Sequence, residues 1–233
     1  MKAVLAKRFQ FEAAHANPEG GERAAGMHGH SYIVDLLASG AVNPDFGWVV
    51  DYADMAQYFS AVYGQLDHKC LNNLPDLETP SIPNLETWIR GRIPDQFQWF
   101  EDVHVSIVGP CRFEVTDAPA QEALGLPRRL RFWIEAAHAL PNAPTGHKCG
   151  ELHGHSFAID AACSDLDALR KPLEKLYNEL DHRNLNDIAG LDNPTSEHLS
   201  KWAWDFLHDE GAPSLEAVVV QETCTARCIY RGE

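Results

Sequence analysis

Six of the twelve histidines fall into two sets of three that occur in the same order. The sets are His15, His28 and His30, then His138, His153 and His155. In each set a single glycine separates the last two histidines, so both imidazoles project from one face of an extended segment. The third histidine joins them if its segment pairs with theirs. Three imidazoles without a fourth protein ligand are typical of a zinc site with one open coordination position.

Other interpretations of these histidines are weaker. A single His-x-His motif is often an ordinary surface or core pair. The third histidine, and the recurrence of the whole set, favour a metal site instead. A closed structural zinc site is disfavoured because such sites usually contain cysteine thiolates. We therefore expect Zn²⁺ as the cofactor and both sets as metal sites.

A thiol stands close to the second set. Cys149 lies four residues before His153, between glycines and next to Lys148. Nearby positive charge favours the thiolate, which acts as a base or nucleophile. Asp181 and His182 add a carboxylate and an imidazole that could relay protons. The combination predicts proton transfer beside a metal-polarised oxygen. The alternatives are a small buried cysteine and an Asp-His pair that makes only local hydrogen bonds.

The chain repeats beyond its histidines. The recurring segments are residues 11–15 with 134–138, 27–31 with 152–156, 66–68 with 180–182, and more loosely Glu86 and Trp88 with Glu197 and Trp202. Matches in the same order indicate a tandem duplication. Prolines and glycines between residues 116 and 129 interrupt any regular pattern and mark the junction. We expect a first unit over residues 1–121 and a second over residues 122–233.

Each unit is predicted to be α+β with an antiparallel sheet. The expected strands cover residues 5–15, 31–38 and 103–108, then 129–138, 156–162 and 217–222; the expected helices cover 53–66, 166–180 and 195–207. Residues 43–47 predict a hairpin-like turn in the first unit. The second unit lacks this stretch, because 37 positions separate His30 from Asp67 but only 26 separate His155 from Asp181.

Bulk composition excludes several classes of protein. The chain has 233 residues, of which 45% are hydrophobic, and a net charge of −15. Such a charge argues against nucleic-acid binding, which needs a basic face. No apolar run approaches the roughly 20 residues of a membrane span, and the first residues do not resemble an export signal. The six cysteines are too few for a disulfide scaffold. We expect a cytoplasmic protein with reduced thiols.

The second unit resembles the queuosine-pathway branch, the 6-carboxy-5,6,7,8-tetrahydropterin synthases, of the 6-pyruvoyltetrahydropterin synthase family. The resemblance rests on residues 135–138, 146–149, 153–156, 180–182 with Leu185 and Asn186, 193–197 and 221–226. It implies two tandem tunnelling-fold units, each an antiparallel four-stranded sheet with two helices on one face. Three units close a barrel in this fold, so a homo-oligomer is expected, a trimer or a multiple of it.

The resemblance also implies a reaction. The substrate would be 7,8-dihydroneopterin triphosphate, and a lyase reaction would give 6-carboxytetrahydropterin, acetaldehyde and triphosphate. Zinc on His138, His153 and His155 would bind the side-chain hydroxyls. Cys149 would move the proton, with Asp181 and His182 assisting. Glu222 would hold the guanidine-like edge of the pterin, for which a carboxylate is suited. Thr195, Ser196 and Glu197 would complete the substrate site.

The first unit departs from this pattern. Ala24 occupies the position of Cys149, and Ile107 that of Glu222. We therefore expect that this unit is no independent active site, although it retains its histidines. Asp67 and His68 would serve the Cys149 site if it forms between neighbouring units, which we expect in an assembly that mixes the two copies and not in rings of like copies.

Several alternatives stay open. A 6-pyruvoyltetrahydropterin synthase has the same site and a different product, and a zinc-binding assembly protein would have no chemistry. Cys224 and Cys228 could form an extra metal or redox site, but no further ligands stand near them. The candidate triphosphate contacts are Lys148, Arg183, Arg128 and Arg129.

Overall fold

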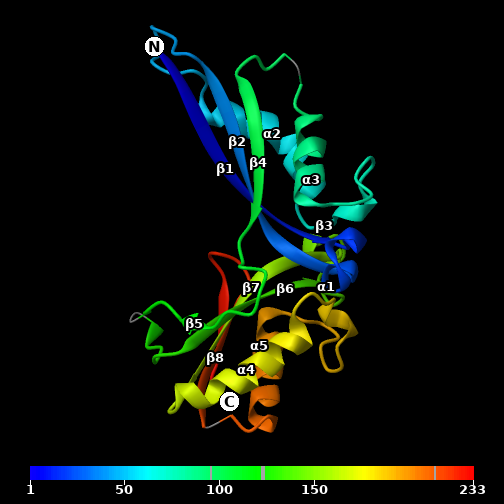
Figure 1. Ribbon diagram of the computed structural model, residues 1–233, viewed down its shortest axis with the longest axis vertical. Helices are drawn as coiled ribbons and strands as arrows, with labels where there is room; N and C mark the ends of the chain where they lie inside the picture. The colour runs from blue at the N-terminus through cyan, green and yellow to red at the C-terminus, as the bar shows by residue number, and fades with distance from the viewer. Residues whose placement is uncertain (95, 122–123, 213) are drawn as a thin grey trace.

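The protein consists of two sheets stacked end to end along its long axis (Figure 1). The computed structural model describes residues 1–94, 96–121, 124–212 and 214–233. The elements of the first unit are β1 (Lys2–His15), α1 (Glu22–Ala25), β2 (His28–Ala41), α2 (Tyr52–Leu66), β3 (Lys69–Cys70), α3 (Ile82–Arg90) and β4 (Phe100–Ile107). Its sheet has the order β3-β1-β2-β4, and α2 and α3 pack against β1 and β4.

The second unit repeats this arrangement. Its elements are β5 (Thr116–Asp117), β6 (Leu130–His138), β7 (His153–Cys163), α4 (Leu166–Leu180), α5 (Ser196–Asp209), β8 (Leu215–Gln221) and β9 (Arg227–Tyr230). The sheet order is β5-β6-β7-β8-β9. Helices α4 and α5 cover one face of this sheet (Figure 1). The expected α+β class and the tunnelling fold are confirmed, and both units have antiparallel main strands.

Each unit has its own core between sheet and helices. In the first unit Phe11 and Leu36 from the sheet meet Phe59 from α2, and all three side chains are fully buried. Burying a side chain of this size contributes about 1.5–3 kcal/mol. Helix α5 begins where the Thr195 hydroxyl accepts a hydrogen bond from the His198 amide, a standard N-cap. The two cores fix each sheet against its helices and thereby fix the strand ends that carry the histidines.

The structure refines several sequence expectations. The expected boundary falls between residues 121 and 122, and residue 122 lies outside the described residues. Strand β5, which the sequence analysis assigned to the first unit, pairs with β6 of the second. Strand β9 and the two-residue β3, which is parallel to β1, were not expected. The turn at residues 43–47 is confirmed, with the Asn43 side chain accepting from the Asp45 and Phe46 amides.

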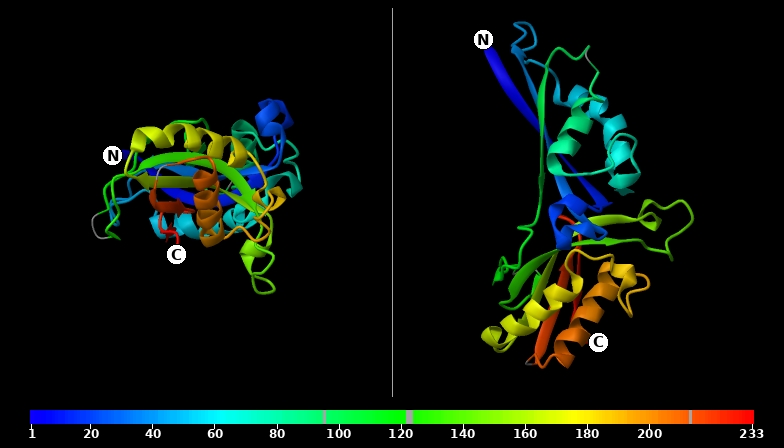
Figure 2. Two further views of the ribbon diagram at one scale, coloured as in Figure 1. Left: turned by 90° about the horizontal axis from the view of Figure 1, so that it is seen from below. Right: turned by 45° about the vertical axis from the view of Figure 1, so that its right-hand side comes forward.

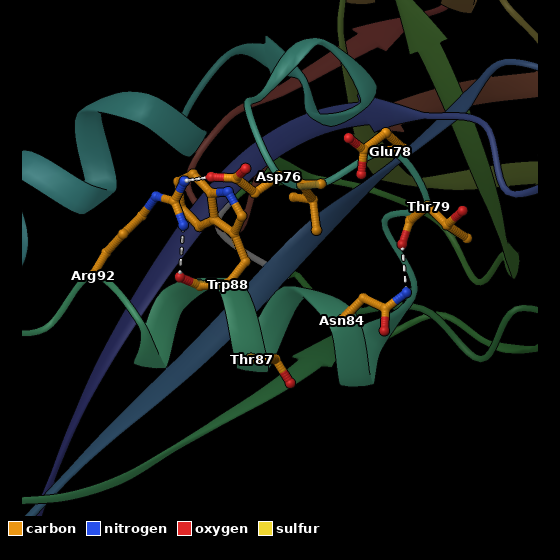
Figure 3. A pocket seen from close by; sticks show the side chains of 8 residues that line it. Asp76, Glu78, Thr79, Asn84, Thr87, Trp88 and Arg92 are labelled. Atoms are coloured by element: carbon orange, nitrogen blue, oxygen red, sulfur yellow. Dashed lines mark hydrogen bonds and ion pairs between the residues drawn. The ribbon is translucent and has the colours of Figure 1, made fainter.

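The loose match between Glu86 and Glu197 is wrong. The indole of Trp88 donates to the Pro75 carbonyl at 2.8 Å, and that of Trp202 donates to the Ala189 carbonyl at 3.0 Å. These matching contacts make the two tryptophans equivalent. Figure 3 shows the surface pocket beside Trp88, where the Arg92 guanidinium lies 3.7 Å from the ring centroid. None of the predicted site residues lines this pocket.

The two units meet where the β1-β2 and β6-β7 strand pairs cross (Figure 2). A Cβ atom added to Gly29 would lie 2.4 Å from the Gly154 Cα, so only glycine permits this approach. Beside the crossing, the Ser31 amide donates to the Ser156 hydroxyl and the Ser156 amide to the Ser31 hydroxyl, each at 3.1 Å. The crossing therefore brings the His-Gly-His segments of both units together. Among the described residues, no helix is long and apolar enough to span a membrane.

Candidate active site at the junction of the two units

The second histidine set gathers where β6 ends and β7 begins. His138 pairs directly with His153 across the two strands, and His155 pairs with Ala136. The ring centroids of His138 and His153 are 4.5 Å apart, and each lies 5.1 Å from that of His155. All three rings are buried. The predicted grouping of these three histidines is present in the structure.

The protonation of this set suits a cation. The Nδ1 atoms of His138 and His153 lie 3.0 and 2.8 Å from the carbonyls of Pro194 and Glu151, which can only accept. Nδ1 therefore carries the hydrogen in both rings. The two Nε2 atoms, which lie 3.1 Å apart, each have a free lone pair. Burial lowers the pKa of His138 to about 3 and that of His153 to about 2.

The third ring of the set completes this donor arrangement. His155 Nε2 is buried and has no hydrogen-bond partner among the described residues. An orphaned acceptor beside two opposed lone pairs can be satisfied by a metal ion. The groups able to hold a metal ion here join His155 with His138 and Glu222, and with His153 and His68. Each group thus contains two of the three predicted ligands together with one further residue.

The first set has almost the same geometry. The ring centroids of His15 and His28 are 4.4 Å apart, and each lies 5.0 Å from that of His30. His15 Nε2 and His30 Nε2 are 3.0 Å apart. Burial lowers the pKa of His15 to about 2 and those of His28 and His30 to about 3. This set is also able to hold a metal ion.

Each set receives an imidazole from the other unit. His68 stacks on His153, with centroids 4.4 Å apart and planes 26° apart. His182 stacks on His28 in the same way, at 4.5 Å and 29°. The groups able to hold a metal ion include His68 with His153 and His155. The Asp-His pair of one unit therefore lies at the histidine set of the other.

The placement of Asp181 and His182 differs from the expectation that they assist Cys149. The contacts of His182 are with His28 and His30 of the first unit. The physical reason is a tight turn after the helix. The His182 amide donates to the Glu135 carbonyl at 2.7 Å, and a φ of 56° turns the ring away from its own unit. The equivalent turn gives His68 a φ of 57° and directs it to the second unit.

This exchange takes place within one chain. We expected Asp67 and His68 to reach the Cys149 site only in a mixed assembly. The units are stacked end to end instead, so the chain itself joins His68 to His153. Two further ion pairs cross here: Lys148 Nζ lies 3.2 Å from Asp67 Oδ2, and Lys69 pairs with Glu151.

The Asp67 carboxylate is strongly favoured in its charged form. Burial would raise its pKa, but the close contact with the His68 imidazole and hydrogen bonds from the Glu12 amide and Lys148 outweigh burial and lower the pKa to about 2. His68 Nδ1 lies 2.9 Å from Asp67 Oδ1. A carboxylate in this position can orient an imidazole and stabilise its protonated form.

Cys149 is half-buried in the 3-10 turn Lys148–Gly150. Burial raises the pKa of its thiol and Glu222 adds to the increase, while Lys148 opposes it. The expectation that positive charge makes this cysteine a thiolate is therefore wrong for the protein without metal. Burial and a carboxylate outweigh the one lysine.

Glu222 lies at the mouth of the second set. Its Oε1 is 3.5 Å from His138 Nε2 and 3.4 Å from His155 Nε2, and its Oε2 accepts from the Ser196 hydroxyl at 2.7 Å. Thr195 caps α5, and Glu197 follows in the first turn of that helix. Ser196 is thus the member of the 195–197 group that touches Glu222.

The corresponding pocket of the first unit has a volume of about 240 Å³ and is lined by the first histidine set and His182. It differs in the groups that would contact a substrate. The second unit has Cys149, Ser196 and Glu222 where the first has Ala24, Ile82 and Ile107. Cys111 also lines this pocket. The first unit thus has alanine and isoleucine at the positions of Cys149, Ser196 and Glu222, and its pocket thiol comes from a different position.

Some candidate contacts are placed elsewhere. Arg129 is fully buried, and its Nε donates to Asp160 at 2.8 Å, so it is not a triphosphate contact. Arg128 pairs with Asp117 of β5. Cys228 accepts from the Ser200 hydroxyl at 3.1 Å. The groups able to hold a metal among the described residues include neither Cys224 nor Cys228.

Sequence reasoning missed two buried glutamates. Glu12 Oε2 lies 2.9 Å from His155 Nδ1, and Glu135 Oε2 lies 2.8 Å from His30 Nδ1. Both contacts cross between the units. The available signal was the repeat itself, because each glutamate stands three residues before the first histidine of its set.

Comparison with known proteins agrees with the duplication of the chain. Residues 4–109 and residues 129–233 each match the family described as 6-pyruvoyl tetrahydropterin synthase. A 6-carboxy-5,6,7,8-tetrahydropterin synthase of Synechocystis is 40% identical over 115 residues, covering 42% of this chain and 88% of that protein. A dihydroneopterin monophosphate aldolase of Pyrococcus furiosus is 32% identical over 93 residues, covering 40% and 76%.

Among solved structures, the 6-pyruvoyl tetrahydropterin synthase of Caenorhabditis elegans aligns with a TM-score of 0.44 and 19% identity, covering 46% of this chain and 90% of that one. The two family matches together span most of the chain and separate where the two sheets separate. The chain belongs to the 6-pyruvoyl tetrahydropterin synthase family and carries the family domain twice.

Proposed function

We propose that this protein is a zinc-dependent 6-carboxytetrahydropterin synthase with one active site per chain. The site uses the metal ligands and Cys149 of the second unit together with Asp67 and His68 of the first. The observation that carries this proposal is the stacking of His68 on His153, which places an imidazole of the first unit beside the second histidine set. His68, His153 and His155 together form one of the groups able to hold a metal ion.

The proposed substrate is 7,8-dihydroneopterin triphosphate, and the products are 6-carboxytetrahydropterin, acetaldehyde and triphosphate. Zinc, held by His138, His153 and His155, would supply a Lewis acid that acidifies the side-chain hydroxyls of the substrate. The similarity to the Synechocystis protein supports the carboxy-forming reaction.

Residues around the metal site have separate roles in the proposed reaction. Cys149 accepts the proton from the side-chain carbon of the substrate as a thiolate, after its own proton has passed to solvent. Burial raises the pKa of this thiol, and Lys148 opposes that increase. Asp67 holds His68 in one orientation, so that His68 can pass a proton to or from a substrate oxygen. The Glu222 carboxylate gives up its hydrogen bond from the Ser196 hydroxyl and accepts hydrogen bonds from two N–H groups of the pterin.

The proposed assembly is a homo-oligomer in which other chains complete each ring. Within the described residues, β1 has a strand on its outer edge only at Ala13 and Ala14, where β3 pairs with it. A long unpaired strand edge is a template for another strand. We expect three chains or a multiple of three, which native mass spectrometry would measure.

The test of the reaction is identification of the product by mass. Zinc-loaded protein should convert 7,8-dihydroneopterin triphosphate to 6-carboxytetrahydropterin, and Cys149→Ala should not. A 6-pyruvoyl product would favour the alternative synthase. Absence of any product from folded, zinc-loaded protein would favour the non-catalytic, zinc-binding assembly protein.

A further inference from the structure

Each unit has a buried glutamate that contacts the histidine set of the other unit. Glu12 stands three residues before His15, and Glu135 stands three before His138. Residues three apart in a strand point to opposite faces. Neither glutamate therefore shares a face with its neighbouring histidine. At the crossing of the two sheets, that opposite face meets the partner unit.

The contacts that result are specific. Glu12 Oε2 lies 2.9 Å from His155 Nδ1 and accepts from the Ser31 hydroxyl at 2.5 Å. Glu135 Oε2 lies 2.8 Å from His30 Nδ1 and accepts from the Ser156 hydroxyl at 2.5 Å. The two arrangements are the same with the units exchanged.

Both glutamate–histidine contacts are buried. The side chains of Glu12 and His155 are 8% and 2% exposed, and those of Glu135 and His30 are 1% and 7% exposed. A carboxyl oxygen that accepts from Nδ1 fixes the tautomer of a metal-binding histidine and leaves Nε2 free for the metal. His155 Nε2 is the buried atom without a partner that the metal would satisfy.

We propose that Glu12 of the first unit is a positioning residue for His155, and that Glu135 of the second unit has the same role for His30. This inference rests on the metal sites of the proposed function. The first unit then supports the catalytic metal centre through Glu12 as well as through His68. It also follows that each centre depends on a residue located outside the unit that provides its ligands.

The experiment measures metal affinity, so it does not depend on turnover. His28→Ala leaves only the second centre, and His153→Ala leaves only the first. Glu12→Gln and Glu135→Gln are placed in each of these two backgrounds. Affinity for Co²⁺ is measured from its visible absorption, and affinity for Zn²⁺ by competition with a chromophoric chelator.

We expect Glu12→Gln to weaken the second centre about 10–100-fold, as is usual when an outer partner of a ligand is removed, and to leave the first within about threefold. Glu135→Gln should do the reverse. Equal losses at both centres would indicate a general folding defect and contradict the inference, as would losses confined to the unit that carries the substitution, or no loss. If neither parent variant binds Co²⁺ or Zn²⁺, the metal sites of the proposed function fail as well.

Discussion

The imidazole of His68 stacks on that of His153 with ring centroids 4.4 Å apart, although 85 positions separate the two residues in the chain. The contact joins the first unit to the unit that carries Cys149 and Glu222. The first unit has Ala24 and Ile107 at those two positions of its own pocket. Under the proposed function, the first unit therefore contributes His68 to the site of the second unit.

The acidity of Cys149 should respond in opposite directions to its two charged neighbours. Glu222→Gln removes a negative charge and should lower the pKa of the thiol, while Lys148→Gln removes a positive charge and should raise it. The pH dependence of iodoacetamide labelling in metal-free protein, followed by mass spectrometry of the peptide containing Cys149, measures both shifts. Shifts of the same sign would contradict the electrostatic account.

Stability of the metal-free protein should fall as the solution becomes acidic. Burial lowers the pKa of five clustered histidines from 6.5 to about 2 or 3: His15, His28, His30, His138 and His153. Because the unfolded chain binds protons more readily, their contribution to stability is complete above pH 6.5 and is lost below it. Below pH 6.5, each of these histidines lowers the free energy of unfolding by up to about 1.4 kcal/mol for every pH unit of acidification.

One buried group acts in the opposite sense. Burial raises the pKa of Glu135 from 4.5 to about 8, so its contribution is complete below pH 4.5 and is lost as the pH rises through 8. Five groups outweigh one, and the melting temperature should drop between pH 7.5 and 5.5. Replacing His15 and His138 by Gln should make the dependence shallower. A melting temperature that stays constant or rises on acidification would contradict this prediction.

The close approach of Gly29 and Gly154, where the two strand pairs cross, should tolerate no side chain. Gly29→Ala places a methyl group 2.4 Å from the Gly154 Cα and should destabilise the protein by about 1–3 kcal/mol or more, since neither backbone can move away without breaking its strand. Gly64→Ala is the matched control. It lies within α2 with no atom near its added Cβ, and should stabilise by about 0.4–1 kcal/mol. Equal melting temperatures for the two variants would contradict the role of the crossing.

The sequence predicted those parts of the structure that depend on local pattern. Strand alternation, helix caps and the repeated His-x-His motif predicted the main strands, the helices α2, α4 and α5, the duplication and both histidine sets. The spacing of His153 and His155 by one residue is enough to place two imidazoles on one strand face. These predictions needed no knowledge of how the units pack.

The sequence left two assignments of the Asp-His pairs open. Asp181 and His182 belong to the same unit as Cys149, whereas Asp67 and His68 reach Cys149 only if the site forms between units. The left-handed turns at His68 and His182 and the end-to-end stacking favour the second assignment, and both depend on tertiary packing. The raised pKa of Cys149 also depends on tertiary packing. It results from burial and from Glu222, which lies 73 positions away in the sequence.

The most direct test compares two matched variants of zinc-loaded protein, His68→Ala and His182→Ala, in the conversion of 7,8-dihydroneopterin triphosphate. The shared-site account predicts that His68→Ala lowers kcat/KM by about 10²–10⁴-fold, while His182→Ala changes it by less than about threefold. A large loss in His182→Ala with normal activity in His68→Ala would contradict the account and assign the chemistry to residues of the second unit alone.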